Sequence, residues 1–172
     1  MARQLWLLRH AEAEPHGVRP DSERRLTERG EQQARTAGIA LAKLQDTFDA
    51  VLFSPKARAR QTAELAAESW SGKLRQRMRE HPPLAGGFDA AQALDALAEA
   101  GPDGRVLLVG HEPDLSGVVA ELTGGRIDLK KGGLAVVRLD ADALEAGASG
   151  ELVVLLRPRE LALIAGVPGD GD

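Results

Sequence analysis

LWLLRH, at residues 5–10, is the stretch from which the fold can be read. Its apolar run, Leu5–Leu8, stops abruptly at Arg9 and His10, which is typical of a short buried strand. Residues 12–21 then form a polar loop, since they contain two prolines and one glycine. The stretch therefore predicts a strand that delivers two basic side chains to one edge of a sheet.

Two further strands end in the same way. Asp49–Phe53 is closed by Ser54-Pro55, and Val106–Val109 runs directly into Gly110-His111. In an open α/β sheet, ligands bind outside the carboxyl ends of the strands. Taken singly, each polar residue here has an ordinary interpretation as a strand end or a surface group. Their joint placement instead predicts a site in which three distant segments bring together two arginines and two histidines: Arg9, His10, Arg58 and His111.

Helical patterns alternate with these strands. We predict helices from a start at Thr27 to about residue 44, over 57–70 with a stop at Gly72, and over 90–100, 114–122 and 160–165. Two later strands, Leu134–Leu139 and Leu152–Leu156, have no long helix between them and can pair antiparallel. The alternation predicts an α/β fold, a doubly wound sandwich around a mostly parallel central sheet.

Composition narrows the class of protein. The chain has 172 residues, of which 43% are hydrophobic and 3% aromatic, so we expect a single domain over 1–165 with an aliphatic core. The Gly/Asp-rich segment 166–172 is expected to be a flexible tail. A net charge of -4 argues against a nucleic-acid partner. The absence of cysteine excludes disulfides and thiolate metal sites.

The same sequence carries no signal for a membrane. No apolar run approaches the roughly 20 residues of a membrane span. The apolar stretch near the start is too short for a signal peptide, and no small-residue cleavage site follows it. We therefore expect a cytoplasmic protein that does not bind membranes.

The expected cluster has the chemistry of an anion site. Arginine presents a rigid fork of donors that matches phosphate oxygens bidentately. A histidine beside it can hold the anion or attack phosphorus, and attack needs the neutral imidazole that a pKa of about 6.5 provides at neutral pH. Flanking cations can stabilise a transferring phosphoryl group without a metal. The sequence contains no EF-hand loop, P-loop or HExxH motif, so no metal is predicted.

Ordered blocks of sequence then indicate a family. The blocks are LLRHAEA at 7–13, RLT with Gly30 and QA within 25–34, SPKARARQT at 54–62, VGHEP at 109–113 and KGGL at 131–134. Together they resemble the histidine phosphatase superfamily, also called phosphoglycerate mutase-like, and are most similar to its short SixA-type phosphohistidine phosphatases. The resemblance covers nearly the whole chain and implies a three-layer α/β/α sandwich, with no cofactor. One departure is Ala11, where the family usually has glycine.

The resemblance implies a role for each residue of the expected cluster. His10 would be the nucleophile, forming a phosphohistidine that water later hydrolyses. Arg9, Arg58 and His111 would bind the phosphoryl oxygens. Arg25 lies in the matched loop and would widen the positive field around the substrate.

A general acid is harder to place from the sequence. Larger relatives carry a glutamate between the Ser-Pro block and the second-histidine block, and residues 80–89 hold no clear equivalent. Asp89 is the nearest candidate by position, although it is also expected to cap the helix over 90–100. Glu80 is a weaker candidate, as are Glu12 and Glu14 beside the nucleophile.

The short insert also bears on the substrate. An imidazole leaving group has a conjugate acid with a pKa of about 6.5 and needs less help from an acid than an alkoxide does. A missing acid therefore favours protein phosphohistidine, and an open pocket could admit a protein side chain. The alternatives are a phosphatase for small sugar or nucleotide phosphates and, in another class, a non-catalytic module that recognises phosphorylated partners.

Overall fold

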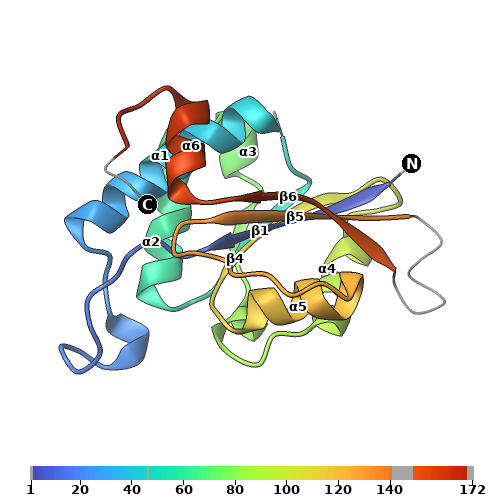
Figure 1. Ribbon diagram of the computed structural model, residues 1–172, viewed down its shortest axis with the longest axis horizontal. Coiled ribbons are helices and arrows are strands. Elements are labelled where there is room, and N and C mark those ends of the chain that lie inside the picture. Colours follow the sequence, from blue (N-terminus) through green and yellow to red (C-terminus); the bar gives the residue numbers. More distant parts are fainter. Residues whose placement is uncertain (1, 46, 141–148, 170–172) are drawn as a thin grey trace.

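A six-stranded sheet forms the centre of the computed structural model, which describes residues 2–45, 47–140 and 149–169. The strands lie in the order β3-β2-β4-β1-β5-β6, so β1 is central (Figure 1). Their bounds, in chain order, are β1 Arg3–Arg9, β2 Ala50–Phe53, β3 Met78–Glu80, β4 Arg105–Gly110, β5 Leu134–Leu139 and β6 Gly150–Leu156.

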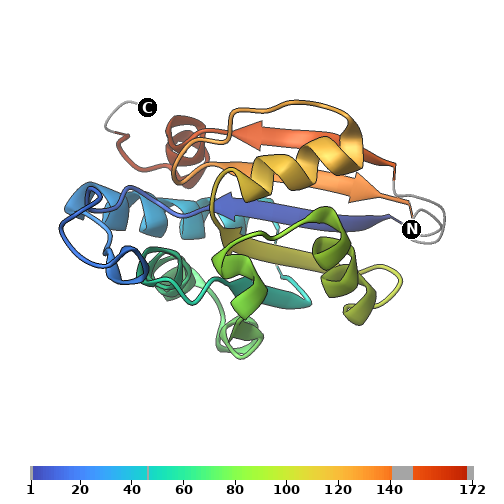
Figure 2. The same cartoon turned by 90° about the horizontal axis from the view of Figure 1, so that it is seen from below.

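Helices cover both faces of this sheet. Helices α4 and α5 pack on one face, and α1, α2 and α6 pack on the other (Figures 1 and 2). The arrangement confirms the predicted α/β/α sandwich. The bounds are α1 Glu28–Leu44, α2 Ala57–Ala66, α3 Gly72–Arg75, α4 Ala90–Glu99, α5 Asp114–Thr123 and α6 Pro158–Ala165, with 3-10 turns at Asp21–Glu23, Ala67–Ser69 and Pro82–Ala85.

The sheet is mixed in strand direction. Strand β4 pairs in parallel with both β1 and β2, and β2 pairs in parallel with β3. Strand β5 instead runs antiparallel to β1, and β6 antiparallel to β5. The expected antiparallel pairing of the last two strands is therefore confirmed, because no crossover helix separates them. The parallel part, β1 to β4, places the carboxyl ends of its strands at one edge.

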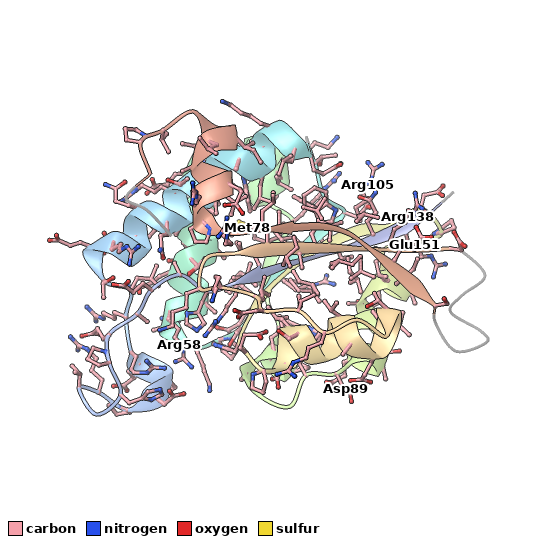
Figure 3. All side chains as sticks on the ribbon, in the orientation of Figure 1. Arg58, Met78, Asp89, Arg105, Arg138 and Glu151 are labelled. Carbon is pink, nitrogen blue, oxygen red and sulfur yellow. The ribbon has the colours of Figure 1, made fainter. Side chains whose placement is uncertain are left out.

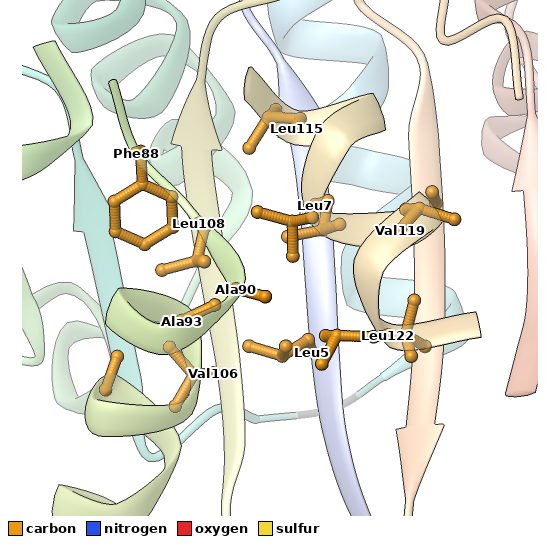
Figure 4. Packing of buried hydrophobic residues seen from close by; sticks show 14 of the residues in the cluster. Leu5, Leu7, Phe88, Ala90, Ala93, Val106, Leu108, Leu115, Val119 and Leu122 are labelled. Atoms are coloured by element: carbon orange, nitrogen blue, oxygen red, sulfur yellow. The ribbon is translucent and has the colours of Figure 1, made fainter. Parts of the chain in front are cut away.

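Side chains of β1 alternate between the two faces of the sheet. Leu5 and Leu7 pack into the layer of α4 and α5, together with branched residues of β4 (Figure 4). Trp6 and Leu8 point to the other face and pack under α1, α2 and α6. Because both faces are covered, the run Leu5–Leu8 is buried throughout, as the sequence predicts for a central strand.

Two local predictions were wrong. The helix predicted over 57–70 ends as an α-helix at Ala66 and closes through a 3-10 turn. Gly72 begins α3 rather than ending a helix, since the Ser71 side chain accepts a hydrogen bond from the backbone N–H of Leu74. The tertiary structure supplies the reason: the Trp70 indole is buried and donates to the carbonyl oxygen of Gly38 on α1, at 3.0 Å, and this holds Trp70 in extended backbone.

The edge of the sheet and the end of the chain complete the fold. Strand β3 was not predicted, because its three residues pair only with β2 and carry no recognisable pattern. Of the expected tail over 166–172, the structure describes 166–169, where Val167 packs against the core; the remaining three residues lie outside the described part. None of the described helices is both long and apolar enough to cross a membrane.

Candidate active site

The parallel register of β1 and β4 brings His10 and His111 side by side. Arg9 pairs with Gly110, so each histidine is the first residue beyond a matched strand end. The backbone N–H of His10 donates to the carbonyl of Gly110 at 3.0 Å. The ring centroids of the two histidines lie 5.3 Å apart, and both side chains are buried.

The end of β2 orients the second histidine. The backbone N–H of Ser54 donates to the carbonyl of Val109, which fixes the turn after β2 against β4. The Ser54 hydroxyl then lies 2.7 Å from Nε2 of His111, and both groups are buried. Nδ1 of His111 is buried and has no hydrogen-bond partner among the described residues. The Ser54 hydroxyl therefore fixes the orientation of the His111 ring through one of its two nitrogens.

Arg58 lies in the first turn of α2 and is 5% exposed. Its Nη1 donates to the carbonyl oxygen of Asp21 at 2.7 Å, and its Nη2 lies 3.3 Å from the Asp21 carboxylate. The same carboxylate accepts from Nζ of Lys56 at 2.9 Å. These contacts, led by the hydrogen bond from Lys56, hold the pKa of Asp21 well below its ordinary value. The sequence placed Asp21 only in a polar loop, whereas the structure places it in contact with Arg58.

Arg9 closes the other side of the site. Its Nη1 donates to the carbonyl of Leu129 at 2.9 Å, and its Nε is buried with no partner among the described residues. The loop ahead of β5 is fixed against the same strand end, because the backbone N–H of Gly132 donates to the carbonyls of Arg9 and His10. Nη1 thus anchors the Arg9 guanidinium, whereas Nε has no hydrogen-bond partner among the described residues.

Both histidines are neutral in the free protein. Burial above all, together with the nearby His111, Arg58 and Arg9, lowers the pKa of His10 to about 3. Burial and then Arg58 and Lys56 likewise lower the pKa of His111 to about 3. All three partners predicted from the sequence thus lie near enough to His10 to influence its pKa.

The tautomer of His10 follows from its backbone. Nδ1 lies 2.7 Å from the carbonyl oxygen of Ala11. A carbonyl can only accept a hydrogen bond, so Nδ1 must carry the proton. The lone pair then resides on Nε2. Chemically, the site offers a neutral nucleophilic nitrogen flanked by two guanidiniums, which suits a tetrahedral oxyanion.

Ala11 fits its position without disturbing this geometry. Its methyl group is fully buried in a small cluster with Leu26 and Ala34. Its backbone N–H donates to Oγ1 of Thr62 at 3.1 Å, and that hydroxyl donates to the carbonyl of Arg58. Thr62 therefore links the segment after the nucleophile to the helix that carries Arg58. The SPKARARQT block contains Thr62, but its role could not be inferred before the fold was known.

Arg25, for which the resemblance suggests a role near the substrate, lies in the loop before α1. Its side chain is exposed, and its backbone N–H donates to the carboxylate of Glu14. The neighbouring Arg24 is buried instead, and it donates to the carbonyl of Glu14 and pairs with Asp21. The charge of Arg24 also lowers the pKa of Arg58, after burial itself. Arg24 is thus the cation of this loop that faces the site; the wider role predicted for Arg25 stays a prediction.

Two of the candidate general acids, Asp89 and Glu80, lie at the start of α4 and at the end of β3. The Asp89 carboxylate accepts from the backbone N–H of Gln92 at 3.0 Å and caps α4, which confirms the N-cap prediction. Figure 3 shows the labelled Asp89 beneath the layer of α4 and α5, apart from the labelled Arg58. Glu80 is exposed at the end of edge strand β3. Assignment of an acid to any of these groups stays a prediction.

The two glutamates near His10 are bound to their own loop. Glu12 accepts from the hydroxyl of Thr27 and pairs with Arg29, and Glu14 pairs with Arg19. Within the described part of the chain, no three His, Cys, Asp or Glu side chains gather as metal ligands would. The strand ends instead bring two arginines and two imidazoles together with the Ser54 hydroxyl and the Asp21 carboxylate.

Comparisons with known proteins agree with this geometry. The family model described as "Histidine phosphatase superfamily (branch 1)" matches residues 5–82. A protein of Picosynechococcus sp. that is named only as uncharacterized is 32% identical over 169 residues, covering 92% of this chain and 98% of its own.

Two solved structures are similar over nearly the same length. The protein histidine phosphatase SixA, in complex with tungstate, has a TM-score of 0.78 and 28% identity, with 92% of this chain and 99% of that chain covered. A protein from Nakamurella multipartitia that also carries the name SixA has a TM-score of 0.74 and 29% identity, with 92% and 97% covered. Fold, site and similarities together define an α/β phosphatase. The chain belongs to the histidine phosphatase superfamily.

Proposed function

We propose that this phosphatase removes the phosphoryl group from protein phosphohistidine through an intermediate on His10. The observation that carries the proposal is the contact of Nδ1 of His10 with the Ala11 carbonyl, at 2.7 Å. It leaves the Nε2 lone pair free next to Arg9, Arg58 and His111, all three of which influence the pKa of His10. A module that only recognised phosphate would need cations but not an oriented, neutral nucleophile.

The reaction proceeds in two displacements at phosphorus. The other ring nitrogen of the substrate first takes a proton from solvent. Nε2 of His10 then attacks phosphorus, a P–N bond forms, and the P–N bond to the substrate breaks, so the leaving group departs as neutral imidazole. Water then attacks the phosphorylated His10, the P–N bond to Nε2 breaks, and inorganic phosphate leaves; water returns a proton to solvent, and the ring of His10 is again neutral. In both steps Arg9, Arg58 and His111 stabilise the phosphoryl oxygens electrostatically, with His111 protonated once the dianion is bound.

The leaving group supports this choice of substrate. Imidazole departs with a conjugate-acid pKa of about 6.5, whereas an alkoxide needs a well-placed general acid. The carboxylates of Asp89, Glu12 and Glu14 are each occupied by hydrogen bonds or ion pairs of their own. The similar SixA is named a protein histidine phosphatase and was solved with tungstate, a tetrahedral oxyanion like phosphate.

The test compares substrates and variants. Wild-type protein and His10→Ala are assayed on a phosphohistidine peptide, on a chromogenic phosphomonoester and on a panel of sugar and nucleotide phosphates. We expect His10→Ala to lose at least about a thousandfold in kcat, since nucleophile removal costs on that order. We also expect the peptide to have the highest kcat/KM.

A matched control uses the exposed imidazole of His16, which lies in the loop after β1. His16→Ala should retain wild-type activity on all substrates. Turnover of small phosphomonoesters without turnover of the peptide would refute the phosphohistidine assignment and favour the small-molecule alternative. Tight phosphate binding without turnover of any substrate would favour the binding module.

A further inference from the structure

A second, strongly cationic cavity adjoins the site and shares Arg9 with it. It has a volume of about 510 Å³ and lies between the end of β1, the first turns of α1 and α6, and the loop before β5. Five of its lining residues are cationic and one is acidic: Arg9, Arg29, Lys130, Lys131 and Arg157 against Glu12. This excess contrasts with the net charge of -4 of the whole chain. The positive potential is therefore local.

The charges at this cavity are only partly neutralised. Glu12 is held by Arg29 at 3.2 Å, and Arg157 pairs with Glu160. Lys130 pairs with the exposed Asp128. Lys131 is exposed and forms no ion pair with any described residue. Surface pairs contribute little attraction in water, so a denser array of carboxylates could displace them.

The two lysines are presented by a defined turn. Gly132 has a φ of 74°, a left-handed conformation that favours glycine, and its N–H donates to the carbonyls of Arg9 and His10. The backbone N–H of Gly133 donates back to the carbonyl of Lys130 at 2.8 Å and closes the turn. Lys130 and Lys131 thus belong to a turn that is hydrogen-bonded to the backbone of Arg9 and of His10.

We propose that this cavity binds acidic side chains that flank the phosphohistidine on the partner protein. The inference rests on the proposed function and names the feature of the partner that the enzyme recognises. An acidic partner is repelled by the negative remainder of the surface and attracted at this cavity. That contrast orients the partner so that its phosphorylated histidine faces His10.

The experiment uses two phosphohistidine peptides that differ only in their flanks, four glutamates in one and four glutamines in the other. For each form of the full-length protein, the ratio of kcat/KM between the two peptides is measured at low salt. We expect wild type to favour the glutamate peptide about tenfold, as a few surface ion pairs allow. The doubly substituted Lys130→Glu/Lys131→Glu protein should lower the ratio to about one or less. Added salt, at about 0.5 M, should lower the wild-type ratio similarly.

The control variant makes the same change in net charge at a part of the surface remote from the cavity. Lys73 and Arg75 are exposed on α3, next to Ala42 near the carboxyl end of α1, whereas the cavity lies at the amino end of that helix. Lys73→Glu/Arg75→Glu should retain the tenfold ratio. Because each variant is judged by a ratio, partial loss of folded protein does not alter the result.

The outcomes separate the inference from the proposed function. A wild-type ratio near one, or an unchanged ratio in Lys130→Glu/Lys131→Glu, overturns the inference while peptide hydrolysis still supports the proposed function. An equal loss of the ratio in both charge-reversed proteins also overturns the inference, since it indicates an effect of total charge. Hydrolysis of neither peptide by an otherwise active wild type overturns the proposed function and the inference together.

Discussion

His10 has two properties that its surroundings impose. It is neutral because burial and the three cationic or potentially cationic groups around it disfavour a charged ring, and its ring is held in one orientation. Burial produces the first property by disfavouring charge, and the Ala11 carbonyl produces the second by accepting from Nδ1. At this scale, the chemistry of the site depends on single contacts within a few ångströms.

Asp21 is the residue whose removal should be most informative. Its carboxylate neutralises part of the charge of Arg58 and Lys56, while its backbone carbonyl orients Arg58 independently of the side chain. Asp21→Asn keeps a carbonyl acceptor but removes the negative charge. We expect inorganic phosphate and tungstate to inhibit this variant at concentrations a few-fold lower than wild type, because the site becomes more positive.

The measurement is competitive inhibition of chromogenic phosphomonoester hydrolysis. The comparison is Asp21→Ala, which lacks the side-chain acceptor as well as the charge. Weaker inhibition of Asp21→Asn than of wild type would mean that the charge of Asp21 holds Arg58 in place, contrary to our expectation.

At the scale of elements, three strand ends and the turns after them build the site. Strands β2, β4 and β1 are neighbours, so residues that follow them meet although they are about 50 positions apart in the chain. This convergence of His10, Arg58 and His111 could be predicted, because parallel strands place their carboxyl ends at one edge. The split of the helix predicted over 57–70 could not, since the buried contact of Trp70 with α1 is a tertiary one.

Asp89 is both the N-cap of α4 and a candidate general acid, so its substitution tests the two roles together. Its side chain and that of Gln92 form reciprocal hydrogen bonds at the start of α4. Asp89→Ala should lower the free energy of unfolding by about 1 kcal/mol, while Asp89→Asn should leave it nearly unchanged, because asparagine caps equally well. Urea denaturation measures both effects. We expect both variants to keep their kcat on a phosphomonoester, since the carboxylate is committed to the helix.

One outcome would contradict the expectation that the Asp89 variants keep their kcat. If Asp89→Asn remained as stable as wild type but lost turnover of an alkyl phosphate, the carboxylate would have to act as an acid. Retained turnover of the phosphohistidine peptide in that variant would then show that imidazole departs without it.

At the scale of the whole molecule, the two buried histidines make stability depend on pH. Both have a pKa near 3 in the folded chain, against about 6.5 when unfolded. Above pH 6.5 both states are neutral and the histidines have no effect. As the pH falls from 6.5 toward 3, the unfolded chain binds protons that the folded chain does not, so stability is lost.

Each histidine should lower the free energy of unfolding by about 1.4 kcal/mol per pH unit within this window. Urea denaturation between pH 7.5 and about 5, in buffer free of phosphate, measures the slope. His10→Asn should reduce the contribution of the two buried histidines to this slope by about half. An unchanged slope in His10→Asn would mean that His10 is protonated in the folded protein.

Pattern and composition decided the class of the fold, because alternation of short apolar runs with amphipathic segments admits few packed arrangements. They also indicated which four residues would meet, since strand ends in a parallel sheet lie at one edge, while the role of His10 as nucleophile came from the resemblance to a family. The fold alone decided that Arg24 is buried and pairs with Asp21 while Arg25 is exposed, that Asp21 holds Arg58, and that Lys130 and Lys131 border a cationic cavity. Loops follow no periodicity, so the direction of each of their side chains is set by contacts that exist only after the chain has closed on itself.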